Sequence, residues 1–267
     1  MASYVVTGAS RGLGYAFVTH LASIPGNTVI GIARNKSATE ERLAKDGIKN
    51  VTILAADITD FKALQAAADE TAKITGGSLD VLINNAGLVV EGSHWTTLVE
   101  DTPEHLEEEL MDSFRANVVG IAHTINAFLP LIRKGKDKKV ITLSTGMADL
   151  DLINDFSIGI AAPYSISKAG TNALVAKYNA ALGKKESILF LAISPGVVDT
   201  SEGKPMSEED MAGAQAMGAA FARYAPHFKG PITAEESVKL QMQVIDKATV
   251  ETMGGAFVSH FGNKQWL

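Results

Sequence analysis

Tyr164 and Lys168 are the residues whose types and spacing first suggest chemistry. They stand four positions apart in the stretch Ala162-Pro163-Tyr164-Ser165-Ile166-Ser167-Lys168-Ala169-Gly170. Side chains four apart share one face of a helix. A free phenol has a pKa of about 10, so roughly 4 kcal/mol of differential stabilisation would bring it to neutral pH, and a neighbouring ammonium can supply much of that. Tyr164 is therefore a candidate proton donor, although a tyrosine and a lysine at this spacing more often form a solvated pair.

A glycine-rich turn near the start of the chain is the second candidate. The sequence Thr7-Gly8-Ala9-Ser10-Arg11-Gly12-Leu13-Gly14 lies between a predicted strand and a predicted helix. Glycines at such a turn let the backbone approach a pyrophosphate, which rests on the positive N-terminus of the helix. An ordinary strand-to-helix turn can have the same composition, but its place in the first βαβ unit favours dinucleotide binding.

The residues after the second predicted strand indicate which dinucleotide would bind. An NAD site places a carboxylate there for the ribose 2′-hydroxyl, whereas a 2′-phosphate is accommodated by an arginine. The chain has Ala33-Arg34-Asn35 at this point and a further guanidinium at Arg11. Two guanidiniums suit a phosphate, so NADP(H) is favoured over a structural role in which Arg34 merely lies beside the sheet.

Polar residues also end the next two predicted strands. Asp57-Ile58 follows the third strand, where the carboxylate can accept a hydrogen bond from the adenine amino group. The alternative is a helix N-cap, for which Asp60 is better placed. Asn84-Asn85-Ala86-Gly87 ends the fourth strand, at the edge of the sheet where cofactors lie in doubly wound folds. By itself this second segment is equally typical of an asparagine-rich turn.

Short apolar runs alternate with helical patterns along the chain, and these elements would position the candidate residues. Strands are predicted at residues 3–7, 28–33, 51–55, 79–83, 139–143, 188–193 and 255–259. Helices are predicted at about 15–24, 38–46, 61–75, 103–131, 162–182 and 235–246, with loop and short helices over 197–229. This alternation is typical of βαβ units and predicts an α/β fold with a parallel sheet covered on both faces. No repeat or linker is visible, so one domain over residues 1–267 is expected.

Composition excludes several classes of protein. The chain has 267 residues, of which 46% are hydrophobic and 20% charged, and this suits one large α/β domain. It has no cysteine, so disulfides, thiol nucleophiles and cysteine-ligated zinc are excluded. The histidines show no metal-ligand spacing, so no metal site is predicted. A net charge of −6 argues against a nucleic-acid surface, and the basic run 134–139 is interpreted as a solvated loop. With no signal peptide and no membrane-spanning apolar run, a cytoplasmic protein is expected.

Taken together, these segments resemble the short-chain dehydrogenases/reductases. The matching segments, in the family's order, are Thr7–Gly14, Asn84-Asn85-Ala86-Gly87, Asn117, Tyr164-Ser165-Ile166-Ser167-Lys168 and Pro195-Gly196-Val197-Val198-Asp199-Thr200. The resemblance covers nearly the whole chain and implies a single Rossmann-like, doubly wound domain with a seven-stranded parallel sheet in the order 3-2-1-4-5-6-7. The ending 254–267 resembles the smaller carbonyl-reductase-like members, including ketoreductases of fungal natural-product pathways.

The resemblance also implies roles for individual residues. Tyr164 would protonate a carbonyl oxygen as hydride arrives, and Lys168 would lower the tyrosine pKa and hydrogen-bond the nicotinamide ribose. Asn117 would hold a water that links Lys168 to solvent. Val198 and Thr200, after Pro195-Gly196, would anchor the carboxamide and so fix which face of the nicotinamide presents its hydride.

The hydroxyl member of the family's tetrad is ambiguous. The family places two small or hydroxyl residues after the fifth strand, and the second is catalytic. Here Ser144 stands first and Thr145 second. Either hydroxyl can donate to a substrate oxygen. The register from the strand favours Thr145, the residue type favours Ser144, and Thr145 is slightly preferred.

Two segments are expected on the substrate side. The interval from Thr145 to Tyr164 is longer than the family's common form, and the surplus at 147–158 alternates apolar residues with aspartates. The lid-like segment 197–229 carries methionine and aromatic side chains, namely Met206, Met211, Met217, Phe221 and Tyr224. Such side chains adapt to irregular apolar ligands. A surface loop without a role and an ordinary packed core are the respective alternatives.

These observations favour an NADPH-dependent reductase of a ketone or aldehyde on a small organic substrate, in secondary metabolism if the fungal resemblance holds. A pathway enzyme that cyclises or isomerises its substrate in the same pocket is the first alternative. A non-catalytic NADP(H) sensor is the second, although such proteins commonly lose the tyrosine or the lysine. By family analogy, a homodimer or homotetramer would form through the helices near 103–131 and 163–182.

Overall fold

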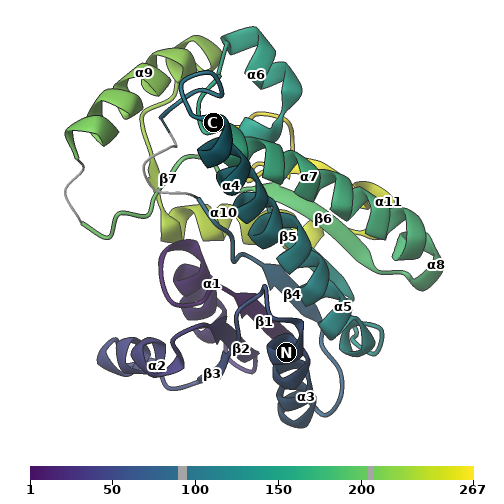
Figure 1. Ribbon diagram of the computed structural model, residues 1–267. Helices are drawn as coiled ribbons and strands as arrows, with labels where there is room; N and C mark the ends of the chain where they lie inside the picture. The colour runs from purple at the N-terminus through teal and green to yellow at the C-terminus, as the bar shows by residue number, and fades with distance from the viewer. Residues whose placement is uncertain (90–94, 204–206) are drawn as a thin grey trace.

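Seven parallel strands form the centre of the molecule, as Figure 1 shows. The computed structural model describes residues 1–89, 95–203 and 207–267. The strands are β1 (Ser3–Thr7), β2 (Thr28–Ala33), β3 (Val51–Ala55), β4 (Val81–Asn84), β5 (Lys139–Leu143), β6 (Leu189–Ser194) and β9 (Phe257–Ser259). Their order is β3-β2-β1-β4-β5-β6-β9. The α/β fold and the predicted order are therefore confirmed, with β9 as the seventh strand of the sheet.

The strands are apolar on both faces because helices cover both sides of the sheet. Every residue of β1 and of β6 is buried. Successive side chains of a strand point to opposite faces, and the two neighbours Val5 and Val6, both fully buried, belong to different core clusters. One cluster packs against α1 and α10, and the other against α3 and α5. Continuous apolar runs of this kind are typical of parallel sheets.

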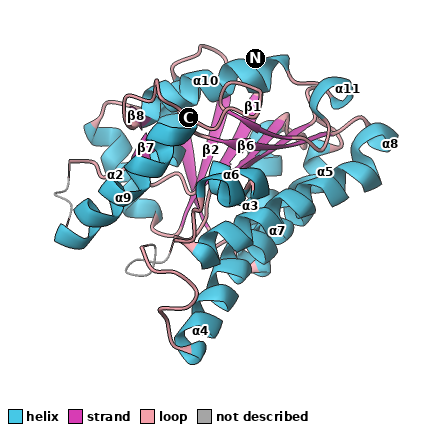
Figure 2. Ribbon diagram, turned by 90° about the horizontal axis from the view of Figure 1, so that it is seen from above, coloured by secondary structure: helices cyan, strands magenta, loops and turns pink. Residues whose placement is uncertain are grey.

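The helices lie in two layers around the sheet, which is clear when the molecule is viewed from above in Figure 2. The α-helices are α1 (Gly12–Ala22), α2 (Lys36–Lys45), α3 (Phe61–Thr75), α4 (Pro103–Phe114), α5 (Gly120–Ile132), α6 (Leu150–Phe156), α7 (Ala162–Tyr178), α8 (Lys184–Glu186), α9 (Glu208–Tyr224), α10 (Ala234–Lys247) and α11 (Val250–Met253). Shorter helical turns are η1 (Arg115–Val119), η2 (Gly146–Ala148) and η3 (Asn179–Gly183). A small parallel pair, β7 (Val198–Asp199) and β8 (Ile232–Thr233), lies outside the main sheet.

Side-chain caps explain where several helices begin. Asn35 accepts from the backbone of Ala38 at the start of α2, and Asp60 accepts from two backbone groups at the start of α3. Thr233 forms a capping box with Glu236 at the start of α10. Each cap satisfies N–H groups that a helix leaves without an internal partner. Asp60 is thus the N-cap of α3, as the sequence predicted.

Two predicted elements differ from the observed ones. The helix predicted over 103–131 is α4 followed by α5, with the π-helical turn η1 between them. The segment 197–229, predicted as loop and short helices, contains the 17-residue helix α9. Glycine and alanine in α9 weaken the apolar periodicity from which a helix is predicted. The helix is stabilised instead by packing against a distant part of the chain.

A third, smaller apolar cluster lies apart from the two main cores, and we refer to it as the roof. Its buried residues are Leu152, Ile158, Phe221 and Trp266, supplied by the segment around α6, by α9 and by the C-terminal tail. Figure 1 shows α6, α9 and the C-terminus together at the top of the molecule. The two segments expected on the substrate side therefore pack on one another.

Within the described ranges, no helix combines the length and the apolar character that crossing a bilayer requires. The cytoplasmic location expected from the sequence stays a prediction.

Candidate active site

Helix α7 places Tyr164 and Lys168 at the carboxyl end of the sheet. The helix begins directly after Ala161, which has a left-handed backbone (φ 52°), and Pro163 occupies its first turn, where a missing N–H costs nothing. Tyr164 is partly buried, whereas Lys168 is only 4% exposed. The lysine Nζ lies 5.8 Å from the centre of the Tyr164 ring. The predicted shared face of the two side chains is therefore present.

Lys168 is held by the end of strand β5. Its Nζ donates to the backbone oxygen of Leu143 at 2.8 Å. Burial disfavours the charged ammonium and lowers the pKa of Lys168 to about 8. The lysine is therefore fixed beside the tyrosine, and its ammonium releases a proton more readily than a lysine in water does.

The pKa of Tyr164 is raised to about 12, and burial is the cause. A hydrogen bond with the side chain of Thr145 acts in the opposite direction but is weaker. Burial dominates in this arrangement, where the Lys168 Nζ donates to Leu143, and the expected lowering of the tyrosine pKa by Lys168 stays a prediction. Tyr164 therefore keeps its proton at neutral pH.

The structure separates the two candidate hydroxyls after β5. Thr145 is partly exposed, hydrogen-bonds with Tyr164 and accepts from the backbone of Met147 at 3.3 Å. Ser144 is 2% exposed and its Oγ has no hydrogen-bond partner among the described residues. The two side chains thus lie in different surroundings, and only that of Thr145 reaches the tyrosine.

We expect Thr145→Val to lower kcat about 100-fold, because it removes a hydroxyl beside the proton donor while preserving side-chain shape. Ser144→Ala is the matched control and should change kcat less than threefold, because its hydroxyl bonds to nothing in the described structure. Steady-state kinetics of both variants, with circular dichroism to confirm folding, tests this. A larger loss in Ser144→Ala would reverse the assignment.

Asn117 lies in the π-helical turn η1 and is fully buried. Its side chain donates to the backbone oxygen of Leu88 and to Ser167 Oγ, both at 2.9 Å, and accepts from the backbone N–H of Leu88 at 2.7 Å. Its backbone oxygen accepts from the Thr171 hydroxyl. Asn117 therefore joins the loop after β4 to helix α7. Its side chain positions these two segments, and the water relay expected of it stays a prediction.

Gly87 shows that these groups meet at one place. A Cβ built on Gly87 would lie 2.9 Å from Asn117 Oδ1 and 3.3 Å from Lys168 Nζ. The absence of a side chain at this position leaves room for the asparagine and the lysine. Three residues predicted separately from the sequence are thus brought together at the end of β4.

The glycine turn after β1 forms a close-packed cradle. Gly8 and Gly12 have positive φ values of 71° and 53°, and a Cβ on Gly14 would lie 2.1 Å from the backbone oxygen of Gly8. The turn leads into α1, whose N-cap, Arg11, supplies no side-chain hydrogen bond. The turn itself therefore supplies no side-chain cap to the first N–H groups of α1, where an anion is favoured, and a bulkier turn could not adopt this shape. Ser10 and Leu13 complete the turn.

The asparagines after β4 have structural partners. Asn85 Nδ2 donates to the backbone oxygens of Thr7 and Gly8, and Thr7 Oγ1 accepts from the backbone of Asn85 and Ala86. Asn84 is 2% exposed and donates to Thr142 Oγ1 on β5. Asn85 therefore fixes the glycine turn to the neighbouring loop. The side chain of Asn84 lies within the sheet, so only its backbone could line a cofactor site.

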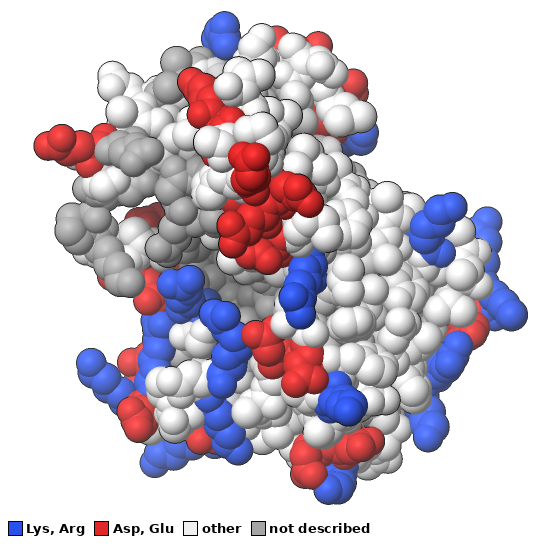
Figure 3. Space-filling view, in the orientation of Figure 1, with Lys and Arg blue, Asp and Glu red and all other residues white. Residues whose placement is uncertain are grey.

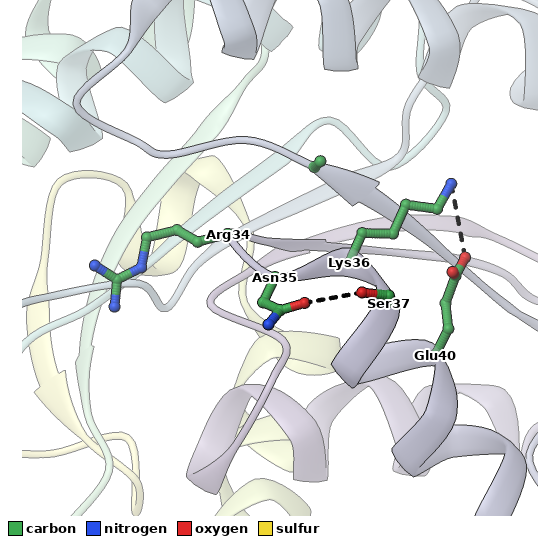
Figure 4. Close-up of a pocket in the computed structure, with 6 residues that line it drawn as sticks. Arg34, Asn35, Lys36, Ser37 and Glu40 are labelled. Carbon is green, nitrogen blue, oxygen red and sulfur yellow. Dashed lines mark hydrogen bonds and ion pairs between the residues drawn. The ribbon is translucent and has the colours of Figure 1, made fainter.

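Arg34 lies at the edge of an open pocket after β2. The pocket has a volume of about 580 Å³ and is lined by Arg34, Asn35, Lys36, Ser37, Glu40 and Ala55. In Figure 4, Arg34 points away from Lys36, which pairs with Glu40 at 3.6 Å. Asn35 is used as the cap of α2. Figure 3 shows basic side chains gathered over α1 and α2. Arg34 and Arg11 are both exposed.

Asp57 and Ile58 follow β3 beside the same pocket. Burial alone would raise the pKa of Asp57, but hydrogen bonds from Thr59 and the charges of Arg34 and Arg115 lower it below its ordinary value. The carboxylate is therefore ionised and able to accept a hydrogen bond. Ile58 is buried, and its side chain would contact a Cβ placed on Gly120. Its side chain thus packs on α5 rather than facing the pocket.

The loop after β6 reaches the glycine turn. The backbone oxygen of Pro195 accepts from Ser237 on α10, and Gly196 adopts a positive φ of 83° against the buried ring of His260. Val198 belongs to β7, and Thr200 lies beside Gly12, with a methyl group 3.4 Å from a Cβ built there. The predicted carboxamide segment is therefore on the same side of the sheet as the glycine turn.

Arg42 and Glu202 contact this site, and neither was predicted from the sequence. Glu202 Oε1 accepts from the backbone N–H of Gly12 at 3.3 Å and from Arg42 Nη1 at 2.8 Å. Arg42 stands three residues after the buried Thr39 of α2, so helical spacing could have indicated that both face the body of the protein. Glu202 follows Gly12 by 190 positions in an irregular segment, so no sequence pattern could have paired them.

A row of three ionisable side chains at the start of α4, beginning just before the helix, was also missed. Asp101, His105 and Glu109 stand four residues apart, and their ligand atoms lie within 4.8 Å of one another. His105 Nδ1 is 2.8 Å from Asp101 and Nε2 is 3.6 Å from Glu109, so both ring nitrogens face carboxylates. A hydrogen bond with Asp101 and the two carboxylate charges raise the pKa of His105. Spacing of four on a predicted helix was the signal. The arrangement suits a protonated histidine bridging two carboxylates.

A parallel sheet in this order, a glycine cradle after β1 and a tyrosine–lysine pair on α7 define a Rossmann-like oxidoreductase domain. The family model described as short chain dehydrogenase matches residues 3–211. The short-chain dehydrogenase/reductase AacuF of Aspergillus aculeatus is 55% identical over 267 residues, with complete coverage of both chains. The short chain dehydrogenase virK of Hypocrea virens is 48% identical over 272 residues, also with complete coverage of both chains.

Solved structures agree on the fold. The structure of an NADPH-bound carbonyl reductase from chicken fatty liver superposes with a TM-score of 0.77 at 24% identity and 98% coverage of each chain. The chain belongs to the short-chain dehydrogenase/reductase family, which confirms the resemblance inferred from its motifs.

Proposed function

We propose that this protein is an NADPH-dependent carbonyl reductase that acts on a ketone or aldehyde of a small organic substrate. The observation that carries the proposal is the hydrogen-bonded pair of Tyr164 and Thr145, adjacent to the buried Lys168. Two hydroxyls that meet at the end of a sheet can both donate to one oxygen atom. Such a site stabilises negative charge as it develops on a carbonyl oxygen.

The protein's own residues donate the proton and position the substrate oxygen. When bound, the nicotinamide supplies the hydride. Tyr164 transfers its phenolic proton to the oxygen that becomes the alcohol, and Thr145 fixes that oxygen by a second hydrogen bond. Lys168, held by Leu143, provides positive charge beside the phenol as it loses its proton. Asn117 keeps the loop after β4 in register with α7, so that these groups stay aligned.

The residues fit a phosphorylated dinucleotide. The cradle has no room for side chains at Gly8 and Gly14, Gly12 adopts a positive φ, and the N-terminus of α1 follows. Arg34 has no hydrogen bond or ion pair among the described residues and lies at the pocket after β2, and Arg11 is exposed. Two exposed guanidiniums favour a 2′-phosphate. The NADPH bound in the chicken carbonyl reductase agrees with this choice.

We expect Arg34→Ala to raise the KM for NADPH about 10- to 100-fold and to leave the KM for NADH within threefold, because only NADPH carries the phosphate that Arg34 would bind. Lys36→Ala is the matched control, since Lys36 lines the same pocket but pairs with Glu40. Initial-rate kinetics with both cofactors measures the preference. Equal weakening toward NADPH and NADH would contradict the assignment.

The substrate we propose is an apolar secondary-metabolite intermediate. The roof is built from aliphatic and aromatic residues of α6, α9 and the tail, and its Trp266 packs beside Gly146, the residue after Thr145. The fungal relatives are short-chain dehydrogenases themselves and share the whole length of the chain. Purified protein should oxidise NADPH in the presence of at least one member of a panel of aromatic and alicyclic ketones. No NADPH oxidation with any carbonyl would overturn the proposal.

Self-association is part of the proposal. Met111 and Phe114 on α4 and Ile166 on α7 are exposed, at 63%, 43% and 48%. These two helices pack side by side and are the ones expected to pair in a homodimer or homotetramer. Light scattering of the purified protein measures the mass directly, and a monomer at micromolar concentration would remove this part of the proposal.

A further inference from the structure

The N-terminus of α1 is occupied by a carboxylate from a distant part of the chain. Neither its N-cap, Arg11, nor an acidic residue in its first turn caps the helix. Instead, Glu202 Oε1 accepts from the backbone N–H of Gly12 at 3.3 Å. An N–H group carries one hydrogen, and a helix N-terminus favours an anion. Glu202 therefore occupies the place that a dinucleotide phosphate would take at this turn.

The same carboxylate oxygen is bound by Arg42, which is itself fixed in place. Arg42 Nη1 lies 2.8 Å from Glu202 Oε1 and also donates to the backbone oxygen of Ser10 at 3.2 Å. The guanidinium lies 3.9 Å above the ring of Tyr15, whose hydroxyl donates to Asp46. Arg42 is thus held against α1 and the glycine turn, and its Nη1 also donates to Glu202.

The backbone conformation around Glu202 directs its carboxylate toward Gly12 and Arg42. Glu202 has a positive φ of 54°, a conformation that residues with a side chain rarely adopt. Asp199 accepts from the backbone N–H of Ser201 and closes the preceding turn. Thr200 lies against Gly12. Burial would raise the pKa of Glu202, but hydrogen bonds from Arg42 and Gly12 lower it, so the side chain is ionised at neutral pH.

We propose that Glu202 is an internal competitor of the cofactor, whose carboxylate must leave Gly12 and Arg42 before a dinucleotide phosphate can bind there. The inference rests on the proposed dinucleotide site. Once released, Arg42 becomes a third cation, beside Arg11 and Arg34, able to face the cofactor. Glu202 stands between β7 and α9, the helix that supplies Phe221 to the roof.

Replacement of Glu202 tests the competition without the need for a substrate. Calorimetric titration of 2′-phospho-ADP-ribose and of NADP⁺ into Glu202→Gln should show binding about three- to tenfold tighter than in the wild type, because the neutral amide oxygen holds Gly12 and Arg42 less strongly than the carboxylate of this partly exposed pair. Asp199→Asn is the matched control, since it removes the same charge three residues away, keeps an oxygen that can accept from Ser201, and has no hydrogen bond to Gly12 or Arg42 among the described residues. It should bind both ligands within twofold of the wild type.

Glu202→Asp separates a competing contact from simple charge repulsion. The aspartate keeps the negative charge but is one methylene shorter, so it cannot reach Gly12 and Arg42 from the same backbone. Competition predicts tighter binding in this variant as well, whereas repulsion alone predicts wild-type affinity.

The outcomes distinguish this inference from the proposed function. Equal affinities in the wild type, Glu202→Gln and Asp199→Asn, or weaker binding in Glu202→Gln, would overturn the role of Glu202 and leave the dinucleotide site intact. If the wild type bound neither 2′-phospho-ADP-ribose nor NADP⁺, both the proposed function and the competition would fall.

Discussion

Tyr164→Phe should lower kcat for carbonyl reduction about 1000-fold while leaving the affinity for NADPH within twofold. The change removes one hydroxyl, which is the only group of the site that both contacts Thr145 and holds an acidic proton at neutral pH. General acid catalysis is worth about 10²- to 10⁴-fold, and no other described acid reaches this place. The phenol ring remains to fill the space. Single-turnover reduction of a ketone, followed by NADPH absorbance, measures the loss directly.

Tyr178→Phe provides the matched control for this change. Tyr178 lies in the same helix, and its hydroxyl donates to Asn126 at 2.9 Å, away from the site. Its loss should cost about 1 kcal/mol of unfolding free energy and leave kcat unchanged. If Tyr164→Phe retained more than a tenth of wild-type kcat, the proton would have to come from another group and the proposed mechanism would be wrong.

The raised pKa of Tyr164 also sets the expected pH dependence. Burial holds that pKa at about 12, so the phenol stays protonated through neutral and mildly alkaline solution. Reduction consumes this proton and alcohol oxidation needs the phenolate. The unliganded arrangement therefore holds Tyr164 in the protonation state that reduction requires.

Lys168→Met should lower kcat/KM by about 100-fold or more and, at the same time, stabilise the folded protein near neutral pH. The activity falls because the positive charge beside Tyr164 is lost. The stability rises because the wild-type ammonium is buried and, among the described residues, donates one hydrogen bond, to Leu143. Lowering the pKa from 10.5 to about 8 costs roughly 3 kcal/mol of unfolding free energy, which the methionine recovers, while the loss of the hydrogen bond takes back about 1 kcal/mol.

The sign of the pH effect follows from the same pKa. Between pH 8 and 10.5 the unfolded chain still holds the lysine proton that the folded protein has released, so the unfolding free energy of the wild type rises with pH in this window. The advantage of Lys168→Met, about 2 kcal/mol at pH 7, should therefore shrink as the pH approaches 10. Urea unfolding of both proteins at pH 7, 8.5 and 9.5 measures the difference.

Lys139→Met is the control for the lysine prediction. Lys139 lies at the opposite end of β5, and its Nζ also donates to a backbone oxygen, that of Ile245 at 2.7 Å. This variant should keep wild-type activity and show no gain of stability at pH 7. A Lys168→Met protein that is less stable than the wild type at pH 7 would mean that the buried ammonium has compensating contacts, and the pKa argument would fail.

The sheet and the central pair were predictable because local sequence carries their information. Apolar runs such as β1 and β6 are buried on both faces, so composition alone indicates a covered parallel strand. Tyr164 and Lys168 share a helical face by spacing, and the glycine turn must lack side chains for steric reasons. These features depend on neighbours within about eight positions.

Other features depend on contacts between distant segments. Thr145 was separated from Ser144 only by their surroundings, since one hydroxyl meets Tyr164 and the other is enclosed. Asn84 was expected at the cofactor edge as part of the segment after β4, and only the structure shows that its side chain donates to Thr142 within the sheet. Met217 was weighed as a substrate contact, and it packs in the roof, while Met206 lies outside the described residues. Tertiary packing decided each case.

Trp266 in the roof and Trp95 beside α9 each pack closely on neighbouring residues. Trp266 stacks on Phe257 with ring centres 4.4 Å apart, and a Cβ on Gly146, the residue after Thr145, would lie 2.7 Å from it. Trp95 lies against Gly213 of α9 in the same close manner. Neither tryptophan belongs to the two main cores.

The chain has only these two tryptophans, so its tryptophan fluorescence is a signal from the roof and its margin on β9 rather than from the two main cores. Apolar clusters this small open at lower free energy than a central sheet. Emission spectra recorded during titration or heating would therefore report the opening of the substrate side, while far-ultraviolet circular dichroism reports the helices and strands beneath it. The protein carries its own optical probe for the part of the molecule that we expect to select the substrate.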